Sequence, residues 1–159
     1  MWRTVLTILA LIPLSLTSLH AHAVGDCSVS ATSVAFGSYT YDTPSPTDTT
    51  GNIEVSCTLE GIISLIIGYD ITFSTGNSGS YSPRTLAFGA NNLSYNLYTD
   101  AARTSIWGDG SASTSTVSDS YLLGLLTEVR NYPVYGRLPA AQNKPAGSYS
   151  DTIIVTVTY

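Results

Sequence analysis

The segment richest in chemically capable side chains runs from residue 95 to residue 110 and reads YNLYTDAARTSIWGDG. Its two carboxylates, Asp100 and Asp109, suggest a calcium site or a pair of catalytic acids. The segment lacks the closely alternating Asp and Asn ligands and the distal Glu of an EF-hand loop. Catalytic acids must lie on facing elements, and the spacing selects no pair among the eleven acidic residues of the chain. We therefore interpret the segment as scaffold.

The N-terminus has the pattern of a secretory signal peptide. Arg3 precedes an apolar run from Val5 to Leu16, and the sequence AHA at 21–23 is the small-x-small pattern of a cleavage site. The run is shorter than the roughly 20 apolar residues that a membrane-spanning helix needs. We predict a signal peptide over residues 1–23 and one exported domain over residues 24–159.

Charge and composition argue against several functional classes. The formal net charge of the chain is -5, and its few cations are scattered, so we expect no nucleic-acid partner. Both histidines, His20 and His22, lie in the predicted signal peptide, which leaves no imidazole for a catalytic triad or a metal site. We expect no enzyme activity, no metal and no small-molecule cofactor.

Two arginines lie beside aromatic residues in the sequence. Arg84 follows Tyr81 closely, and Arg137 follows Tyr135. A cation in such a place stacks on the ring or pairs locally. We predict structural roles for both arginines, with ligand binding as the alternative.

Cys27 and Cys57 are the two cysteines of the chain. In an exported protein, a structural disulfide is the expected state of such a pair. Closing a loop of about 30 residues contributes on the order of 3 to 4 kcal/mol in the loop-closure model. A metal-binding or reactive thiol pair is the alternative, but the sequence offers neither further soft ligands nor an activating base.

Apolar residues recur at every second position, and Gly, Pro, Asn or Ser interrupts nearly every run. This pattern predicts an all-β protein without helices. Strands with one apolar face suit a two-sheet β-sandwich. In the segment around Tyr95, Asn96 falls on the face opposite Tyr95, and a short edge piece carrying Ile106 and Trp107 follows between two turns. The residues predicted to face inward are Ile53, Val55, Cys57, Leu59, Ile71, Phe73, Leu93, Tyr95, Leu97, Ile153, Val155, Val157 and Tyr159.

Two segments are too apolar for simple alternation. They read GIISLIIGY at 61–69 and SYLLGLLTEV at 120–129. Short continuous apolar runs are typical of fully buried strands. The alternative is a pair of exposed apolar loops, which would mark a contact surface.

Several motifs spread over the exported domain carry a resemblance to a known family. They read CSVSATSVAFGSY from Cys27, TGNIEVSCT from Thr50, TGNSGSYSPRTL from Thr75, YNLYTDAARTSIWGDG from Tyr95, VYGRLPAAQNKPAGSYSDT from Val134, and VTVTY at the end. Together and in this order, they resemble the spore coat protein U domain family, which includes the subunits of archaic chaperone-usher pili of the Csu type.

The resemblance implies an immunoglobulin-like, pilin-type β-sandwich that lacks its final strand and is completed by a donor strand. A periplasmic chaperone, and then another pilus subunit by strand exchange, would supply that strand, with an outer-membrane usher in the pathway. Filling about five pockets contributes on the order of 10 kcal/mol, which rivals the stability of a whole domain. The residues expected at the donor-strand groove and the chaperone contact are Val29, Ile53, Val55, Val155, Val157 and Tyr159.

Fibre-forming subunits of the family carry an N-terminal donor segment. Here only Val24, Gly25 and Asp26 lie between the predicted cleavage site and Cys27. We therefore expect a subunit that accepts a strand but donates none, at a fibre tip or outside the polymer. A tip subunit would present apolar loops to a surface, and the candidates are Ile63, Ile66, Leu123 and Leu126.

Two functions follow from the resemblance. The first is a structural or adhesive subunit of a chaperone-usher surface pilus, exported through the periplasm to the cell surface and involved in attachment and biofilm formation. The alternative is a secreted spore or cell-surface coat protein without fibre polymerisation. A secreted hydrolase is disfavoured because the residues offer no catalytic arrangement.

Overall fold

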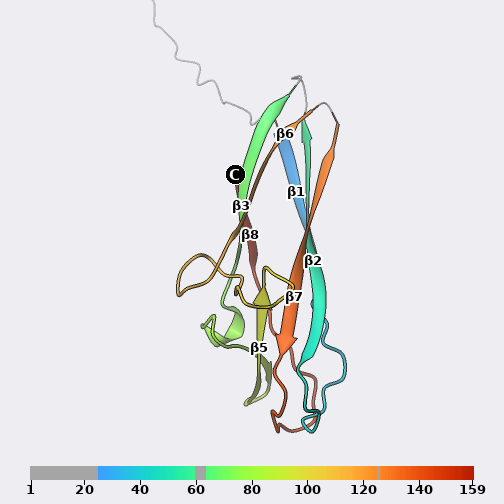
Figure 1. The fold of residues 1–159 in the computed structure, drawn as a ribbon, viewed down its shortest axis with the longest axis vertical. Helices are drawn as coiled ribbons and strands as arrows, with labels where there is room; N and C mark the ends of the chain where they lie inside the picture. The colour runs from blue at the N-terminus through green and yellow to red at the C-terminus, as the bar shows by residue number, and fades with distance from the viewer. Residues whose placement is uncertain (1–24, 60–63, 125) are drawn as a thin grey trace, which may run out of the picture.

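The computed structural model describes residues 25–59, 64–124 and 126–159. This part of the chain is built of β-strands, with one short 3-10 turn, η1, and no α-helix (Figure 1). The elements are β1 Gly25–Thr32, β2 Thr47–Leu59, β3 Leu65–Phe73, η1 Gly76–Ser78, β4 Arg84–Phe88, β5 Asn91–Tyr98, β6 Val117–Leu123, β7 Glu128–Leu138 and β8 Val155–Thr158. The all-β prediction is confirmed.

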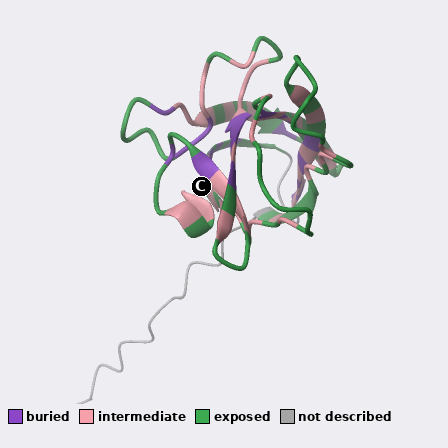
Figure 2. Ribbon diagram, turned by 90° about the horizontal axis from the view of Figure 1, so that it is seen from below, coloured by how far each residue is buried: buried purple, intermediate pink, exposed green. Residues whose placement is uncertain are grey.

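The strands form two antiparallel sheets. The larger sheet has the order β1-β2-β7-β5-β4, and the smaller has the order β6-β3-β8. Seen along the strands, the buried segments lie on the inner sides of the sheets, and the surrounding loops are largely exposed (Figure 2). The predicted two-sheet sandwich is therefore also confirmed.

The core follows the period-two pattern of the sequence. In β2, Ile53, Val55, Cys57 and Leu59 are buried, while the residues between them are only partly buried. Alternation of this kind places one face of a strand against the other sheet. Trp107, expected on a short edge piece, is instead fully buried, stacked on Phe73 with ring centroids 4.3 Å apart.

Arg84 is buried inside the sandwich and is held by neutral acceptors. Its guanidinium donates to the carbonyl oxygens of Ser74 and Trp107 and to the side-chain oxygen of Asn96. The guanidinium carbon also lies 5.1 Å from the centre of the Tyr81 ring. Asn96, on the face of its strand opposite Tyr95, is buried as well, and its amide oxygen helps to satisfy this buried cation. Arg84 has the structural role that the sequence predicted.

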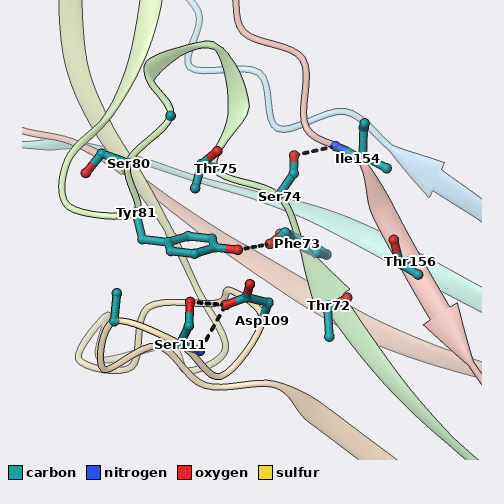
Figure 3. A pocket seen from close by; sticks show the side chains of 12 residues that line it. Thr72, Phe73, Ser74, Thr75, Ser80, Tyr81, Asp109, Ser111, Ile154 and Thr156 are labelled. Carbon is teal, nitrogen blue, oxygen red and sulfur yellow. Dashed lines mark hydrogen bonds between the residues drawn. The ribbon is translucent and has the colours of Figure 1, made fainter.

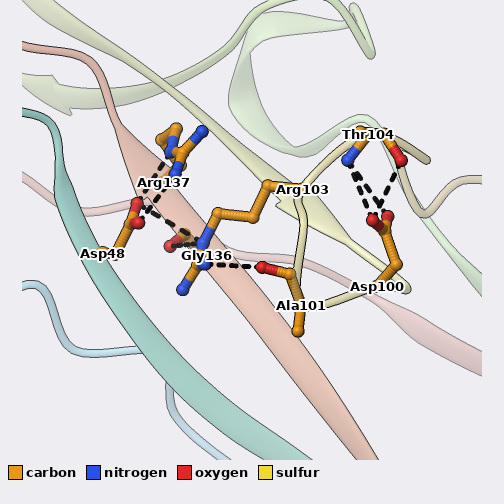
Figure 4. A network of polar contacts seen from close by, with 7 residues as sticks. All are labelled: Asp48, Asp100, Ala101, Arg103, Thr104, Gly136 and Arg137. Carbon is orange, nitrogen blue, oxygen red and sulfur yellow. Dashed lines mark hydrogen bonds and ion pairs between the residues drawn. The ribbon is translucent and has the colours of Figure 1, made fainter.

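Arg137 also has a structural role, but through a different contact from the one expected. It donates two hydrogen bonds of 2.8 Å to Asp48 (Figure 4). The cation over the Tyr135 ring is Arg103, at 5.8 Å from the ring centre. Arg137 is engaged by Asp48 because the two residues lie directly opposite each other in the β2–β7 register.

The carboxylates of the opening segment fix turns. Asp100 accepts hydrogen bonds from Thr104 (Figure 4). It also accepts one of 2.7 Å from the backbone N–H of Ser105, and this bond holds the pKa of Asp100 below its usual value. Asp109 accepts from the N–H and hydroxyl of Ser111, which likewise lowers its pKa. The segment is scaffold, as its spacing indicated.

Candidate functional site

Two edge strands flank an opening between the sheets. β1 is an edge of the larger sheet and pairs with β2, and β8 is an edge of the smaller sheet and pairs with β3. Within the described part of the chain, no strand pairs with the outer side of either one. An edge strand presents unpaired backbone N–H and C=O groups to any extended chain that reaches it.

A groove of about 320 Å³ lies between these two edges. Its lining includes Ala31 of β1 and Val155 of β8, with Ile53 and Phe73 from the paired strands behind them. Val34, in the segment that follows β1, also contributes. The groove therefore opens directly onto the hydrophobic core.

Val29 and its partner Val55 show that the core lacks cover at β1. The two residues are directly opposed in the β1–β2 register, so their side chains lie on the same face of the sheet. Val55 is 0% exposed, whereas Val29 is 43% exposed. Because both face inward, the difference arises from the absence of covering side chains above β1.

Apolar side chains on the other side of the opening also lack covering side chains. Val155 and Val157 of β8 are half-buried, while their β3 partners, Phe73 and Ile71, are buried. The inward faces of both sheets are thus uncovered on the same side of the sandwich. The uncovered space has apolar walls on two sides and a free strand edge at each rim.

The structure places the residues predicted for the groove in different positions. Ile53 and Val155 line the groove, whereas Val29, Val157 and the fully buried Val55 lie on the strands beside it and do not line it. The inward position predicted for Tyr159 is wrong: it lies beyond the end of β8, is 70% exposed and borders a separate shallow depression. Alternation places a side chain inward only while the strand continues, and this strand stops at Thr158.

Sequence reasoning missed part of the lining. Val34 and Phe36 reach the groove from the loop after β1, where no alternation is present to place them. Ile153 was predicted to face inward but was not assigned to the groove, which it lines. The apolar letters VAF at 34–36 within a polar loop are the signal that pointed to such a role.

One end of the groove is closed by the chain itself. Ser150 exchanges backbone hydrogen bonds with Ala87 of β4, and the chain then crosses to the smaller sheet. On this crossing, the hydroxyl of Tyr95 donates to Asp151 at 2.6 Å. Burial raises the pKa of Tyr95, and the bond to Asp151 raises it further, so the phenol remains a donor. The backbone of Ile154 forms two bonds with Ser74, which fix the start of β8.

The predicted disulfide is present. Cys27 and Cys57 are directly opposed in the β1–β2 register, with Cα atoms 4.1 Å apart, and are bonded through their sulfurs. The bond ties the edge strand β1 to the buried strand β2. It therefore holds one wall of the groove in place.

The two apolar segments form paired strands with an exposed apolar side. Ile66 of β3 lies opposite Leu122 of β6, and these side chains are 74% and 67% exposed. Leu126, beyond the end of β6, is also exposed. The sequence left two interpretations of these segments, fully buried strands or exposed apolar loops. Neither fits fully, because the segments form strands that are buried on one face and exposed on the other. We call Ile66, Leu122 and Leu126 the apolar patch.

Of the four residues predicted for apolar loops, Leu123 is buried and Ile63 is not described by the structure. Leu123 is 0% exposed and belongs to the core, so its assignment to a contact surface is wrong. It lies next to Leu122 on a strand, and neighbouring side chains on a strand point to opposite faces. Ile63 lies outside the described residues.

A second hollow, of about 770 Å³, lies beside the start of β8 and is rich in hydroxyl groups (Figure 3). Its polar groups serve the protein's own structure. Tyr81 donates to the carbonyl oxygen of Phe73 at 3.0 Å, and Asp109 accepts from Ser111. Asp109 also accepts from the backbone N–H of Ser111, so this pair closes a turn.

Metal-binding clusters and membrane-spanning helices are both absent from the described residues. In residues 25–59, 64–124 and 126–159, no group of three or more His, Cys, Asp or Glu side chains is placed to hold a metal ion. None of the helical structure in these ranges is long and apolar enough to span a membrane.

Comparison with known proteins gives consistent matches. The model of the Spore Coat Protein U domain matches residues 14–156. Protein U of Myxococcus xanthus is 34% identical over 113 residues, which are 69% of this chain and 59% of that protein. The chain thus spans about three-fifths of the length of this relative.

A solved structure is also similar. It is the crystal structure of the CsuC-CsuE chaperone-tip adhesion subunit pre-assembly complex from archaic chaperone-usher Csu pili of Acinetobacter baumannii. One of its chains matches with a TM-score of 0.54 and 22% identity, over 85% of this chain and 40% of that chain. At this identity, the likeness concerns the fold.

Proposed function

Because the chain belongs to the Spore Coat Protein U domain family, we propose that it is a structural subunit of a surface pilus assembled by the chaperone-usher pathway. Its fold is that of chaperone-usher pilus subunits. The observation that carries the proposal is the uncovered core between β1 and β8, seen in the different exposure of Val29 and Val55. The groove accepts a β-strand from another protein chain.

Physical chemistry favours a strand as the occupant. An extended chain in the groove forms ladder hydrogen bonds with the free edge of β8, and its alternate side chains cover Val29, Val155 and Val157. Each apolar side chain buried in this way contributes roughly 1.5 to 3 kcal/mol. A few such side chains supply a free energy comparable with the stability of an ordinary domain, about 5 to 15 kcal/mol.

The proposed partners follow from this requirement. A periplasmic chaperone supplies the first strand, an outer-membrane usher receives the complex, and a neighbouring pilus subunit replaces the chaperone strand. The similarity to a chain from a chaperone and tip subunit complex supports this order. The protein is accordingly exported through the periplasm to the cell surface.

A strand peptide tests the groove directly. A synthetic peptide with alternating apolar residues is expected to raise the melting temperature of the exported domain. Val29→Lys places a charge on the inward face of the groove wall and is expected to abolish the increase. Ser30→Lys, on the outward face of the same strand, is the matched control and should keep it. A peptide effect that is equal in both variants contradicts the proposal.

We extend the proposal to attachment and biofilm formation through the apolar patch. Exposed apolar side chains lose contact with water when they meet a hydrophobic surface. Ile66→Ser combined with Leu122→Ser is expected to reduce attachment to hydrophobic plastic without reducing export. Thr156→Ala combined with Thr158→Ala, on exposed positions of β8, is the control. Attachment that survives the loss of Ile66 and Leu122 removes this part of the proposal.

The N-terminus decides the position in the fibre. Residues 1–24 lie outside the described part of the chain, so the signal peptide stays a prediction. Cleavage after Ala23 leaves too few residues before β1 for a donor strand, and the subunit then caps a fibre. N-terminal sequencing of the exported protein tests this, because a start well before residue 23 restores a donor segment.

The second candidate function is a coat protein that does not polymerise, and the similarity to Protein U favours it. The two functions differ in their dependence on a chaperone. A pilus subunit is degraded in a strain that lacks the cognate chaperone, whereas a self-sufficient coat protein accumulates at its normal level. Chaperone and usher genes beside the gene for this protein support the pilus.

A further inference from the structure

Among the described residues that line the groove, Asp151 is the charged one. Its Oδ1 atom accepts hydrogen bonds of 2.8 Å from the backbone N–H groups of Asn77 and Thr152. Its Oδ2 atom accepts the bond from Tyr95. A carboxylate has about four acceptor positions, so three bonds do not fill all of them, and Gly76 packs closely against Oδ2 beside the Tyr95 bond.

Asp151 forms no direct ion pair in the described part of the chain, although the buried Arg84 interacts with its charge at longer range. The ion pairs there join Asp48 to Arg103 and Arg137, and Glu128 to Arg130. The buried guanidinium of Arg84 donates to Ser74, Asn96 and Trp107, and not to Asp151. A half-buried carboxylate therefore borders a groove whose other described lining residues carry no charge.

The position of Asp151 places it at the end of any strand that pairs with β8. The residues between Ser150 and Val155 cross from the edge of the larger sheet to the smaller one. A strand that follows the free edge of β8 therefore reaches Asp151 where this crossing closes the groove. The arriving strand covers the exposed part of the carboxylate.

Resting on the proposed strand-accepting function, we propose that Asp151 selects the partner strand by its charge. The partner carries a lysine or arginine at the terminal position of the strand that meets Asp151. Covering a carboxylate that has no direct ion pair is costly, and a charge-assisted hydrogen bond from the partner strand offsets that cost. An acidic residue at this position opposes binding for the same reason.

Peptides with one variable position test the selection. The peptides share an alternating apolar core, have blocked ends, and carry lysine, norleucine or glutamate at the terminal position. Because the direction of the strand is unknown, one set varies the amino end and another varies the carboxyl end. In one of the two sets, the lysine peptide is expected to bind about tenfold more tightly than the norleucine peptide, and the glutamate peptide more weakly than both. Added salt is expected to narrow these differences.

Asp151→Asn is the matched variant, since it keeps the shape and removes the charge. It is expected to retain binding of the norleucine peptide and to lose the preference for lysine. Asp42→Asn, at an exposed carboxylate, should leave the preference unchanged. If Asp151→Asn fails to fold, the peptide series on the wild-type domain still tests the preference for lysine.

The outcomes separate the two proposals. Equal affinities for lysine, norleucine and glutamate in both sets overturn the role of Asp151 but leave the strand-accepting groove intact. Failure of every peptide to bind overturns the groove and, with it, the selection.

Discussion

The hydroxyl of Tyr95 lies 2.6 Å from a carboxylate oxygen of Asp151 and donates a hydrogen bond to it. The bond joins two sequence motifs that are 56 positions apart in the chain. It also links β5 of the larger sheet to the crossing that leads into β8 of the smaller sheet. The most chemically dense segment of the sequence thus helps to shape the groove, although it performs no catalysis in our account.

Tyr95→Phe tests the importance of this link. The change removes one of three donors to Asp151 and adds no volume, so we expect a loss of about 1 to 3 kcal/mol in the free energy of unfolding. Denaturant unfolding measures the loss. Tyr41→Phe, at an exposed tyrosine, is the control and should change the free energy little. Equal stability of Tyr95→Phe and wild type would show that the bond is not needed.

The ion pair of Asp48 predicts a pH dependence of stability. The hydrogen bond from Arg137 lowers the pKa of Asp48 from its ordinary value of 3.8. A carboxyl whose pKa is lower in the folded state stabilises the fold above the ordinary pKa, and this contribution is lost as the pH falls through the folded-state pKa. The pair is partly exposed, so Asp48→Asn should cost at most about 1 kcal/mol at neutral pH.

Stability measured from neutral to acidic pH checks this prediction. The difference between wild type and Asp48→Asn is expected to shrink as the pH drops below 3.8 and Asp48 takes up a proton. A difference that stays constant down to strongly acidic pH would rule out the ion pair as its cause.

Removal of the disulfide is expected to loosen the groove wall. Cys27→Ser combined with Cys57→Ser loses the constraint on the unfolded chain, worth on the order of 3 to 4 kcal/mol for this loop length. Calorimetry or denaturant unfolding measures the change. Wild-type protein treated with a reducing agent should fall to the same stability, and a reduced wild type that stays as stable as the oxidised one would contradict the prediction.

Leu122 and Leu123 are neighbours with opposite environments, and alanine substitutions should separate them. Leu123→Ala empties a core position and is expected to cost about 2 to 5 kcal/mol. Leu122→Ala removes an exposed side chain and should change stability by about 0.5 kcal/mol or less. Thermal unfolding of the two variants side by side provides the comparison. Similar losses in both would mean that Leu122 is covered in solution.

The alternation of β2 allowed most of the fold to be predicted from the sequence. Ile53, Val55 and Cys57 face inward as expected, because the period of a strand fixes the side to which each residue points. The disulfide followed from the compartment that the signal peptide implies. These features depend on local patterns, and local patterns are present in a single sequence.

The exposure of the inward-facing residues could not be predicted in the same way. Val29 and Val55 have the same side chain on the same face, and only the number of strands in the opposite sheet distinguishes them. The burial of Asn96 and Trp107 has a related origin, since a buried arginine from another strand binds the amide of Asn96 and the carbonyl oxygen of Trp107. The exposure of these residues depends on contacts between segments that are distant in the sequence, and such contacts leave no local pattern.

Amide hydrogen exchange of β1 and β8, with and without a bound strand peptide, tests the central claim most directly. The account predicts that backbone amides along both edge strands exchange quickly in the free domain and become protected when the peptide binds, while β2 and β7 in the sheet interior are protected throughout. Edge amides that are already fully protected in the free domain, or that do not respond to the peptide, would contradict it.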